Sequence, residues 1–401
     1  MTNTEHDDLL TALPTERDVR CPFDSPAAQR TGRPLRRMVY PDGHVGWLAT
    51  GYAVVRAVLS DPRFSSRHEL IHNPISGMAG PGGNDAAPTG DMTGIDPPEH
   101  TRFRQLLVGK FTARRMRLLT KRVEQITRDQ LDVLAAHSGP VDLWTLFAQP
   151  VPALVLCELL GVPFEDYDTF QRHTQMALTQ DGRPEEVGMA FQALYRYMRE
   201  LVLAKRTKST DDLLSDLTET DLTDGELAGL SVLLLVAGLD TTASMLGLGT
   251  FALLRNPEQL AALSADPSRW DAAVEELLRY LSVAPRAVRS ALEDVELDGR
   301  LIKAGESVTV SIEAANRDDE RFADPDALDV LRQAGGHLAF GHGIHQCLGQ
   351  QLARVELGVA FPALFARFPN LRLAVPADEV PLRANMSVFG VRELPVVWDE
   401  G

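Results

Sequence analysis

Apolar residues recur at three- and four-residue spacing along most of the chain after residue 99, and this period predicts α-helices. The predicted helices cover residues 99–115, 116–137, 142–160, 165–180, 186–206, 223–254, 257–264, 267–281 and 348–368. Alternating stretches typical of strands are few and short, at residues 43–50, 292–297, 306–312 and 395–398. The pattern therefore predicts a mainly α protein with small β-sheets (α+β).

The first hundred residues are patterned less regularly. Residues 1–35 are polar and mixed, which indicates a loosely ordered N-terminal lead-in. A short helix is expected at residues 52–59. Residues 77–91 are rich in Gly, Pro, Ala and Asn and predict a long loop, of a kind that often covers a functional site. Because no linker divides the chain, we interpret residues 1–401 as a single domain.

The longest apolar stretch lies within the predicted helix at residues 223–254. Leu230 to Leu239 is almost wholly apolar, which is typical of a helix buried on all sides. Asp240 and Thr241 interrupt the stretch and argue against a membrane span. A buried carboxylate requires a partner, so something must compensate for Asp240. A helix with one polar side facing solvent is the alternative interpretation.

Composition narrows the function classes. The chain is 44% hydrophobic, which allows a core large enough to enclose a cofactor. Its formal net charge of -16 argues against general nucleic-acid binding. Three distant cysteines suggest neither a disulfide framework nor a zinc site. The N-terminal residues lack the pattern of a signal peptide or membrane anchor, so we expect a soluble, cytoplasmic protein, with no membrane partner.

Cys347 lies in the most informative segment of the sequence. Gly341 and Gly343 precede it, and apolar residues at helical spacing follow it: Leu348, Leu352, Val355 and Val359. Cys347 is therefore expected where a glycine-rich turn becomes a helix N-terminus. Free N–H groups and the helix dipole there lower a thiol pKa and favour a thiolate, a strong donor to iron. The alternative is a small buried hydrophobic residue, as most free cysteines are.

Residues 340–356, FGHGIHQCLGQQLARVE, resemble the haem-ligand segment of the cytochrome P-450 superfamily, in which Phe-Gly-x-Gly-x-His/Arg-x-Cys-x-Gly precedes Leu-Ala-Arg-x-Glu. The resemblance extends from about residue 43 to 398 and is closest to soluble actinobacterial members. It implies the mainly α fold of that superfamily. It also implies non-covalent haem b, with Cys347 as the iron ligand and with Gly341 and Gly349 beside the ring.

The same resemblance assigns roles around the haem. Residues 237–241 resemble the family's oxygen-binding segment, in which Thr241 would hydrogen-bond oxygen at the iron and Asp240 would help deliver protons. Four residues match the family's propionate contacts: His100, Arg104, Arg289 and His345. Glu276 and Arg279 resemble its structural Glu-x-x-Arg ion pair, which we expect to act with a later loop containing Arg332.

A basic stretch stands out in this acidic chain. From His100 to Val123 there is no acid, and there are eight basic residues: Arg102, Arg104, Lys110, Arg114, Arg115, Arg117, Lys121 and Arg122. A solvated helix face is one interpretation. By resemblance, this helix borders the side nearest the thiolate, so we expect an acidic iron–sulfur ferredoxin to dock near Arg102–Arg122. Electrons would come from NAD(P)H through a reductase and that ferredoxin.

The resemblance also indicates where substrate would bind. Residues 68–95 and 174–195 would form the mouth of an apolar pocket whose walls would include Leu233, Val236, Ala237, Val283, Ala284, Val388 and Phe389. Each of these could instead be ordinary core packing. A bulky apolar substrate fits such a list. The family analogy suggests hydroxylation or epoxidation of a macrolide- or polyketide-like natural product by a monomeric enzyme.

Two other functions are compatible with the same segments. One is a haem-thiolate enzyme that performs peroxide-driven oxidation or oxidative coupling. The other is a non-enzymatic haem sensor or carrier. Asp240 and Thr241 favour the oxygen-dependent monooxygenase, because an acid and a hydroxyl beside the iron serve proton delivery.

Overall fold

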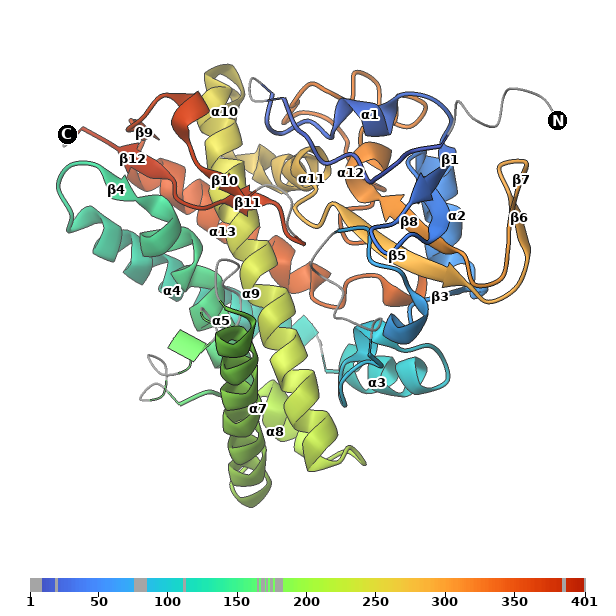
Figure 1. Ribbon diagram of the computed structural model, residues 1–401. Helices are drawn as coiled ribbons and strands as arrows, with labels where there is room; N and C mark the ends of the chain where they lie inside the picture. The colour runs from blue at the N-terminus through green and yellow to red at the C-terminus, as the bar shows by residue number, and fades with distance from the viewer. Residues whose placement is uncertain are drawn as a thin grey trace.

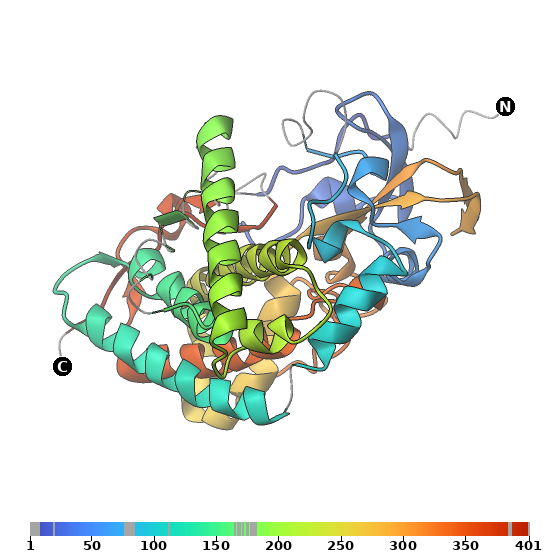
Figure 2. The same ribbon diagram turned by 90° about the horizontal axis from the view of Figure 1, so that it is seen from below.

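The computed structural model describes residues 9–18, 21–75, 85–110, 113–163, 166, 170, 172, 173, 176, 183–383 and 387–399. Most of the long helices lie on one side of the molecule, and the five-stranded sheet, the β6–β7 hairpin and several shorter helices lie on the other (Figures 1 and 2). The α-helices are α1 (Ala27–Arg30), α2 (Tyr52–Ser60), α3 (Glu99–Val108), α4 (Ala113–Ala135), α5 (Pro150–Leu160), α7 (Pro184–Thr207), α8 (Leu213–Thr218), α9 (Asp224–Arg255), α10 (Pro257–Ala265), α11 (Trp270–Leu281), α12 (Ile312–Ala315) and α13 (Gln350–Arg367).

Short 3-10 turns and one π-helix complete the helical elements of the described chain. The 3-10 turns are η1 (His68–Leu70), η2 (Met92–Gly94), η5 (Pro267–Arg269), η6 (Gly343–His345) and η7 (Ala377–Glu379). The π-helix η3 spans Trp144–Ala148 and leads into α5, which begins at Pro150. The single helix predicted at residues 142–160 is therefore divided in the structure. Most of the helix predicted at residues 165–180 lies outside the described residues.

The five-stranded sheet has the order β1 (Leu35–Val39), β2 (Val45–Ala49), β8 (Ser307–Ser311), β5 (Arg286–Ala291) and β3 (Phe64–Ser65). Its strands β2 and β8 are parallel, and its other pairs are antiparallel. The smaller sheets pair β4 (Val141–Asp142), β12 (Pro395–Val397) and β9 (Arg372–Leu373), then β10 (Leu382–Arg383) with β11 (Gly390–Val391), and β6 (Val295–Leu297) with β7 (Arg300–Ile302). The mainly α prediction with small sheets is confirmed.

One predicted strand is confirmed only in part. Of the strand expected at residues 292–297, after Arg289, the structure forms β6 at Val295–Leu297, whereas residues 292 and 293 form a bend and Arg289 itself lies inside β5. β5 was missed because it buries Arg289 and Ser290 instead of alternating apolar with polar side chains.

Helix α9 crosses the centre of the fold (yellow in Figure 1). A capping box starts it: Thr223 accepts from the Glu226 N–H, and the Glu226 carboxylate accepts from the Thr223 N–H. Its C-terminal half packs with α11 and α13, and its N-terminal half packs with α5 and α7. Among the described helices it alone is long and apolar enough to cross a membrane, a property that the core helix of a soluble protein shares. Its central position explains that apolar composition.

The N-terminal segment is packed where the structure describes it. The Phe23 ring lies in the core against Phe251, and Arg17 forms an ion pair with Glu313. Arg317 donates to the Phe23 carbonyl and to the Asp24 carboxylate. Within the described residues 9–18 and 21–35, specific anchors therefore hold a segment whose polar composition had suggested a loosely ordered lead-in.

Candidate functional site

The cysteine segment forms a rigid turn before α13. The Cys347 N–H donates to the Phe340 carbonyl at 2.8 Å and closes the turn. Gly341 and Gly343 have φ angles of +68° and +75°, which side chains disfavour. A Cβ on Gly343 would lie 2.3 Å from the Leu59 carbonyl oxygen, so α2 also requires glycine here. Gly349 caps α13, and a Cβ there would meet no described protein atom within 4 Å.

The surroundings of the Cys347 thiol differ from expectation. Solvent reaches the side chain, but partial burial raises its pKa. The N–H groups of Gly349 and Gln350 and the charges of Arg104 and Arg354 oppose that rise. The prediction of a lowered thiol pKa is therefore wrong for the protein alone, because desolvation outweighs the helix terminus. A bound cation would supply the missing stabilisation of the thiolate.

Four nitrogen-bearing side chains converge beside this turn. His100 and His345 have ring centroids 4.1 Å apart, and Arg104 donates to the Gln346 carbonyl at 2.6 Å. Arg289 reaches the group from β5, where burial lowers its pKa to about 10. The elements α3, β5 and the cysteine turn thus bring together the four residues that the sequence singled out.

The electrostatics of this cluster favour an anion. Burial, followed by the charges of Arg289 and His100, lowers the pKa of His345 to about 3. Burial also lowers the pKa of His100, whose two buried ring nitrogens have no hydrogen-bond partner among the described residues. Asp96 is the acid whose charge opposes these shifts at His100 and Arg289. Unpaired donors and excess positive charge fit the two propionates of haem, and Cys347 offers a sulfur ligand beside them.

On α9, Asp240 has a partner that the sequence did not reveal. Arg383 of β10 donates to the Asp240 carboxylate at 2.8 Å, and Asp240 is 8% exposed. Arg383 also donates to the Ser244 hydroxyl and stacks over Trp144. The Thr241 hydroxyl donates to the Ala237 carbonyl at 2.8 Å. Asp240 is thus held by the C-terminal hairpin, while Thr241 remains half-buried on the next face of the helix.

Glu276 and Arg279 form an ion pair in which both side chains are 0% exposed. Two hydrogen bonds, of 2.7 and 2.8 Å, join the guanidinium to the carboxylate. Arg332 donates to the same carboxylate at 3.1 Å. Arg279 also donates to the carbonyls of Asn316 and Pro325, so the pair ties α11 to the segment before the cysteine turn.

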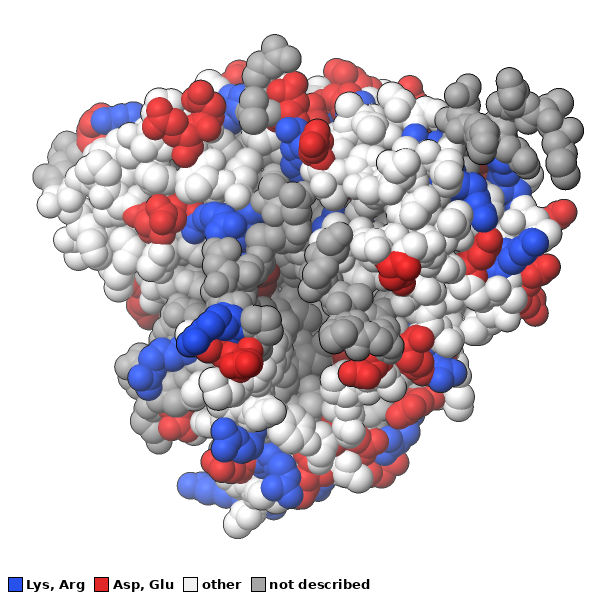
Figure 3. Space-filling view, viewed as in Figure 1, with Lys and Arg blue, Asp and Glu red and all other residues white. Residues whose placement is uncertain are grey.

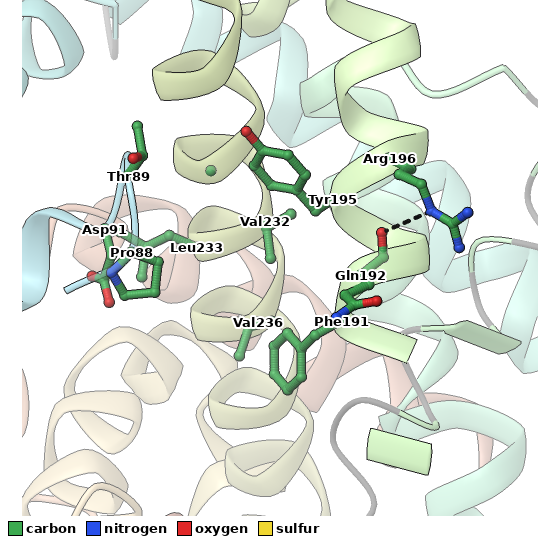
Figure 4. Close-up of a pocket in the computed structure, with 11 residues that line it drawn as sticks. Pro88, Thr89, Asp91, Phe191, Gln192, Tyr195, Arg196, Val232, Leu233 and Val236 are labelled. Atoms are coloured by element: carbon green, nitrogen blue, oxygen red, sulfur yellow. Dashed lines mark hydrogen bonds between the residues drawn. The ribbon is translucent and has the colours of Figure 1, made fainter. Parts of the chain in front are cut away.

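A cavity of about 790 Å³ lies between α7, α9 and residues 88–91 (Figure 4). Its lining includes two of the seven expected wall residues, Leu233 and Val236. It also includes residues from both segments expected at the mouth: Pro88, Thr89, Asp91, Phe191, Gln192 and Tyr195. Sequence did not single out Val232 and Gly229, which line it from α9.

Five of the predicted pocket residues do not line this cavity: Ala237, Val283, Ala284, Val388 and Phe389. Phe389 lies in the core, and the Arg17 guanidinium carbon is 4.0 Å from the centroid of the Phe389 ring. Val283 is also core, and its carbonyl accepts from the Phe389 N–H at 2.7 Å. Apolar identity alone could not separate lining residues from packing residues. Ala237 is exposed one residue beyond Val236 on α9.

Comparison with known proteins places these features in a family. The sequence profile described as Cytochrome P450 matches residues 270–397. Cytochrome P450 105C1 from a Streptomyces species is 51% identical over 383 residues, which are 94% of this chain and 96% of that protein. The chain belongs to the CYP105 family of cytochromes P450.

Two further members are similar over nearly the whole chain. Pentalenic acid synthase from Streptomyces avermitilis is 45% identical over 397 residues, covering 96% of this chain and 97% of that protein. The structure of CYP105P1 in complex with filipin I gives a TM-score of 0.88 at 39% identity, covering 98% of this chain and 100% of that chain. The cytochrome P450 described here is therefore a monooxygenase, and its family implies a haem-thiolate centre.

Part of the basic stretch of this P450 is already paired with acidic side chains. Three of its arginines pair with acids: Arg102 with Glu226 at 2.6 Å, Arg115 with Asp216 at 2.8 Å and Arg122 with Glu158 at 3.1 Å. Arg104 belongs to the cationic cluster, and the Arg114 side chain lies outside the described residues. Arg117 and Lys121 are exposed on α4, and neither has an acidic partner in the part of the chain that the structure describes.

The face that carries α7 and α9 shows acidic and basic side chains interspersed (Figure 3). Among the residues described on this face neither sign dominates, so these residues offer no electrostatic guidance to a charged protein.

Proposed function

We propose that Cys347 ligates the iron of non-covalent haem b and that His100, Arg104, Arg289 and His345 bind its propionates. The convergence of these four side chains beside the cysteine turn carries the proposal. Gly349 leaves room beside α13, and Gly341 allows the turn that presents the sulfur. When bound, haem supplies the activation of O2, one atom of which is inserted into a substrate.

The residues of α9 would manage protons and oxygen during this reaction. The Thr241 hydroxyl, which now donates to Ala237, can rotate to donate toward the haem side. The Asp240 carboxylate would relay protons from solvent, and Arg383 would fix its position. The buried Glu276–Arg279 pair would support the fold rather than take part in the reaction.

We propose a bulky, largely apolar natural product as the substrate. The cavity lining supports this class, because Phe191, Val232, Leu233 and Val236 present apolar surface. The relatives named for pentalenic acid synthesis and solved with filipin I favour hydroxylation or epoxidation of a secondary metabolite, with a macrolide or polyketide as our specific suggestion.

The proposed electron source is NAD(P)H, through a reductase and an acidic ferredoxin that docks on the side of the cysteine turn. Because Arg102, Arg115 and Arg122 are already paired, we assign the steering to Arg117 and Lys121. Replacing both by Glu should slow reduction by ferredoxin at least tenfold at low salt, and salt should shrink the difference. The exposed Lys303, which follows β7 on the opposite side of the molecule from α4, provides a control through Lys303→Glu (Figure 1). Equal slowing by the double replacement and by Lys303→Glu would contradict this docking face.

The decisive experiment for the haem centre is the absorption spectrum of the reduced, CO-bound protein. Thiolate ligation predicts a strongly red-shifted Soret band, and Cys347→Ser should abolish it while the far-ultraviolet circular dichroism is retained. A normal thiolate spectrum in Cys347→Ser would refute the assignment. We further propose a cytoplasmic, monomeric enzyme, which size-exclusion chromatography with light scattering would test for the monomer.

A further inference from the structure

Two glycines meet where the segment before η2 crosses α9. Gly90 has a φ of +89°, and a Cβ there would lie 2.5 Å from both the Glu226 carbonyl oxygen and the Leu230 nitrogen. A Cβ on Gly229 would lie 1.8 Å from the Thr89 carbonyl oxygen and 3.3 Å from the Gly90 Cα. Neither position therefore accepts a side chain without displacing backbone on the opposite side.

This contact has a direct relation to the cavity. Pro88, Thr89 and Asp91, on either side of Gly90, form one wall of it. Phe191 and Tyr195 of α7 form the opposite wall, and α9 runs between the two walls (Figure 4). The glycine contact thus sets how far the first wall stands from α7.

The wall is anchored again immediately after Gly90. The Asp91 carboxylate accepts from the Thr93 N–H at 2.9 Å and from the Thr93 hydroxyl at 2.6 Å. Met92 is buried in the core shared with α5 and α9. Gly90 packs against α9, and residues 91–93 form this turn, so the backbone is held on both sides of Asp91. The Asp91 carboxylate therefore has a fixed position on the cavity wall.

We propose that Gly90 and Gly229 are positioning residues that determine which substrates the cavity accepts. Their backbone contact holds the wall formed by residues 88–91 against α9, and so fixes both the size of the cavity and the position of Asp91. The accepted substrate is then an apolar molecule that fills the space between this wall and α7. This inference rests on the proposed function, because it takes the cavity as the substrate site.

The physical alternative is that Gly229 only completes a helix contact. A glycine within a helix is less favourable than alanine, so Gly229→Ala should stabilise α9 if nothing opposed the new methyl group. Gly188 of α7 supplies the matched control, because a Cβ there would meet nothing within 4 Å.

The test compares Gly229→Ala, Gly90→Ala and Gly188→Ala with the haem-loaded wild type. Hydrogen exchange of the amides in residues 85–95 should accelerate at least tenfold in the first two variants and stay unchanged in Gly188→Ala, since exchange reports local opening. Binding of a bulky triaryl imidazole should weaken at least tenfold in the first two variants, because it contacts the wall, while binding of imidazole itself should change less than about twofold.

Unchanged exchange and an unchanged affinity ratio in Gly229→Ala would overturn the inference. Gly90→Ala keeps the result decisive if the substitution within α9 impairs folding, because it alters only the loop side of the contact. The exchange measurement does not depend on the iron ligand. An absent thiolate spectrum would therefore refute the proposed function without affecting the exchange result, and a normal spectrum with unchanged exchange would refute the inference alone.

Discussion

Replacement of Glu276 by Gln tests the most deeply buried ion pair that the structure describes. The substitution keeps the shape of the side chain but leaves the Arg279 guanidinium, which is 0% exposed, without its carboxylate. Breaking a buried pair from one side typically lowers the free energy of unfolding by about 3–5 kcal/mol. Because whole domains are stable by only about 5–15 kcal/mol, the variant should be close to the limit of folding at 37 °C.

The loss should extend to the cysteine turn through a continuous set of hydrogen bonds. Arg279 donates to the Asn316 carbonyl at 2.8 Å, and the Asn316 side chain accepts from the Leu338 N–H at 2.7 Å. The Leu338 carbonyl in turn accepts from the Gly341 N–H at 2.8 Å. We therefore expect Glu276→Gln to retain haem less firmly as well as to unfold at lower urea concentration.

Urea unfolding followed by circular dichroism and by Soret absorbance measures both effects. Asp271→Asn is the control, because Asp271 is an exposed acid on the same helix and should change the free energy of unfolding by less than about 1 kcal/mol. If Glu276→Gln cost no more than that control, the buried pair would not have the structural importance we assign to it.

Three further predictions follow from individual contacts. Arg383→Gln should lower the yield of product per NAD(P)H about tenfold or more, because Asp240 loses its fixed position. The control Arg372→Gln, which breaks a surface pair with Asp399, should leave the yield unchanged, and equal yields in the two variants would exclude the positioning role. Arg289→Gln should weaken haem retention about tenfold by removing one buried cation from the propionate cluster, as measured by haem transfer to apomyoglobin, and retention equal to wild type would argue against propionate binding. Burial raises the pKa of Glu356 from 4.5 to about 8, so between these pH values the folded protein holds a proton that the unfolded chain has released, and the free energy of unfolding should fall by about 1.4 kcal/mol per pH unit. Glu356→Gln should flatten this dependence, and an equally steep dependence in the variant would disprove the assignment.

The sequence predicted those features in which local pattern and chemistry coincide. The cysteine turn, the long apolar helix and the four cluster residues each carry a local signal, and the fold brings the four together. Arg383 has no such signal, since 143 residues separate it from Asp240 and it stands in a two-residue strand. A buried acid indicates that some partner is needed, but tertiary structure alone determines which one.

Burial, too, could be judged only from the structure. Phe389 was expected at the pocket and packs in the core instead, whereas Gly229, which no chemical pattern distinguishes, lines the cavity. The thiol pKa of Cys347 shows the same difficulty, because desolvation depends on atoms from several elements and the helix terminus is only one influence.

The anchored N-terminal segment has a practical consequence for protein engineering. This segment contacts α9 through Phe23, Glu313 through Arg17 and Arg317 through Asp24. Trimming the chain to residue 36 would therefore expose core surface and remove one charged partner from each of the buried side chains Glu313 and Arg317. Affinity tags and redox-partner fusions should be joined ahead of residue 9, where the first described contacts begin, rather than in place of residues 9–35.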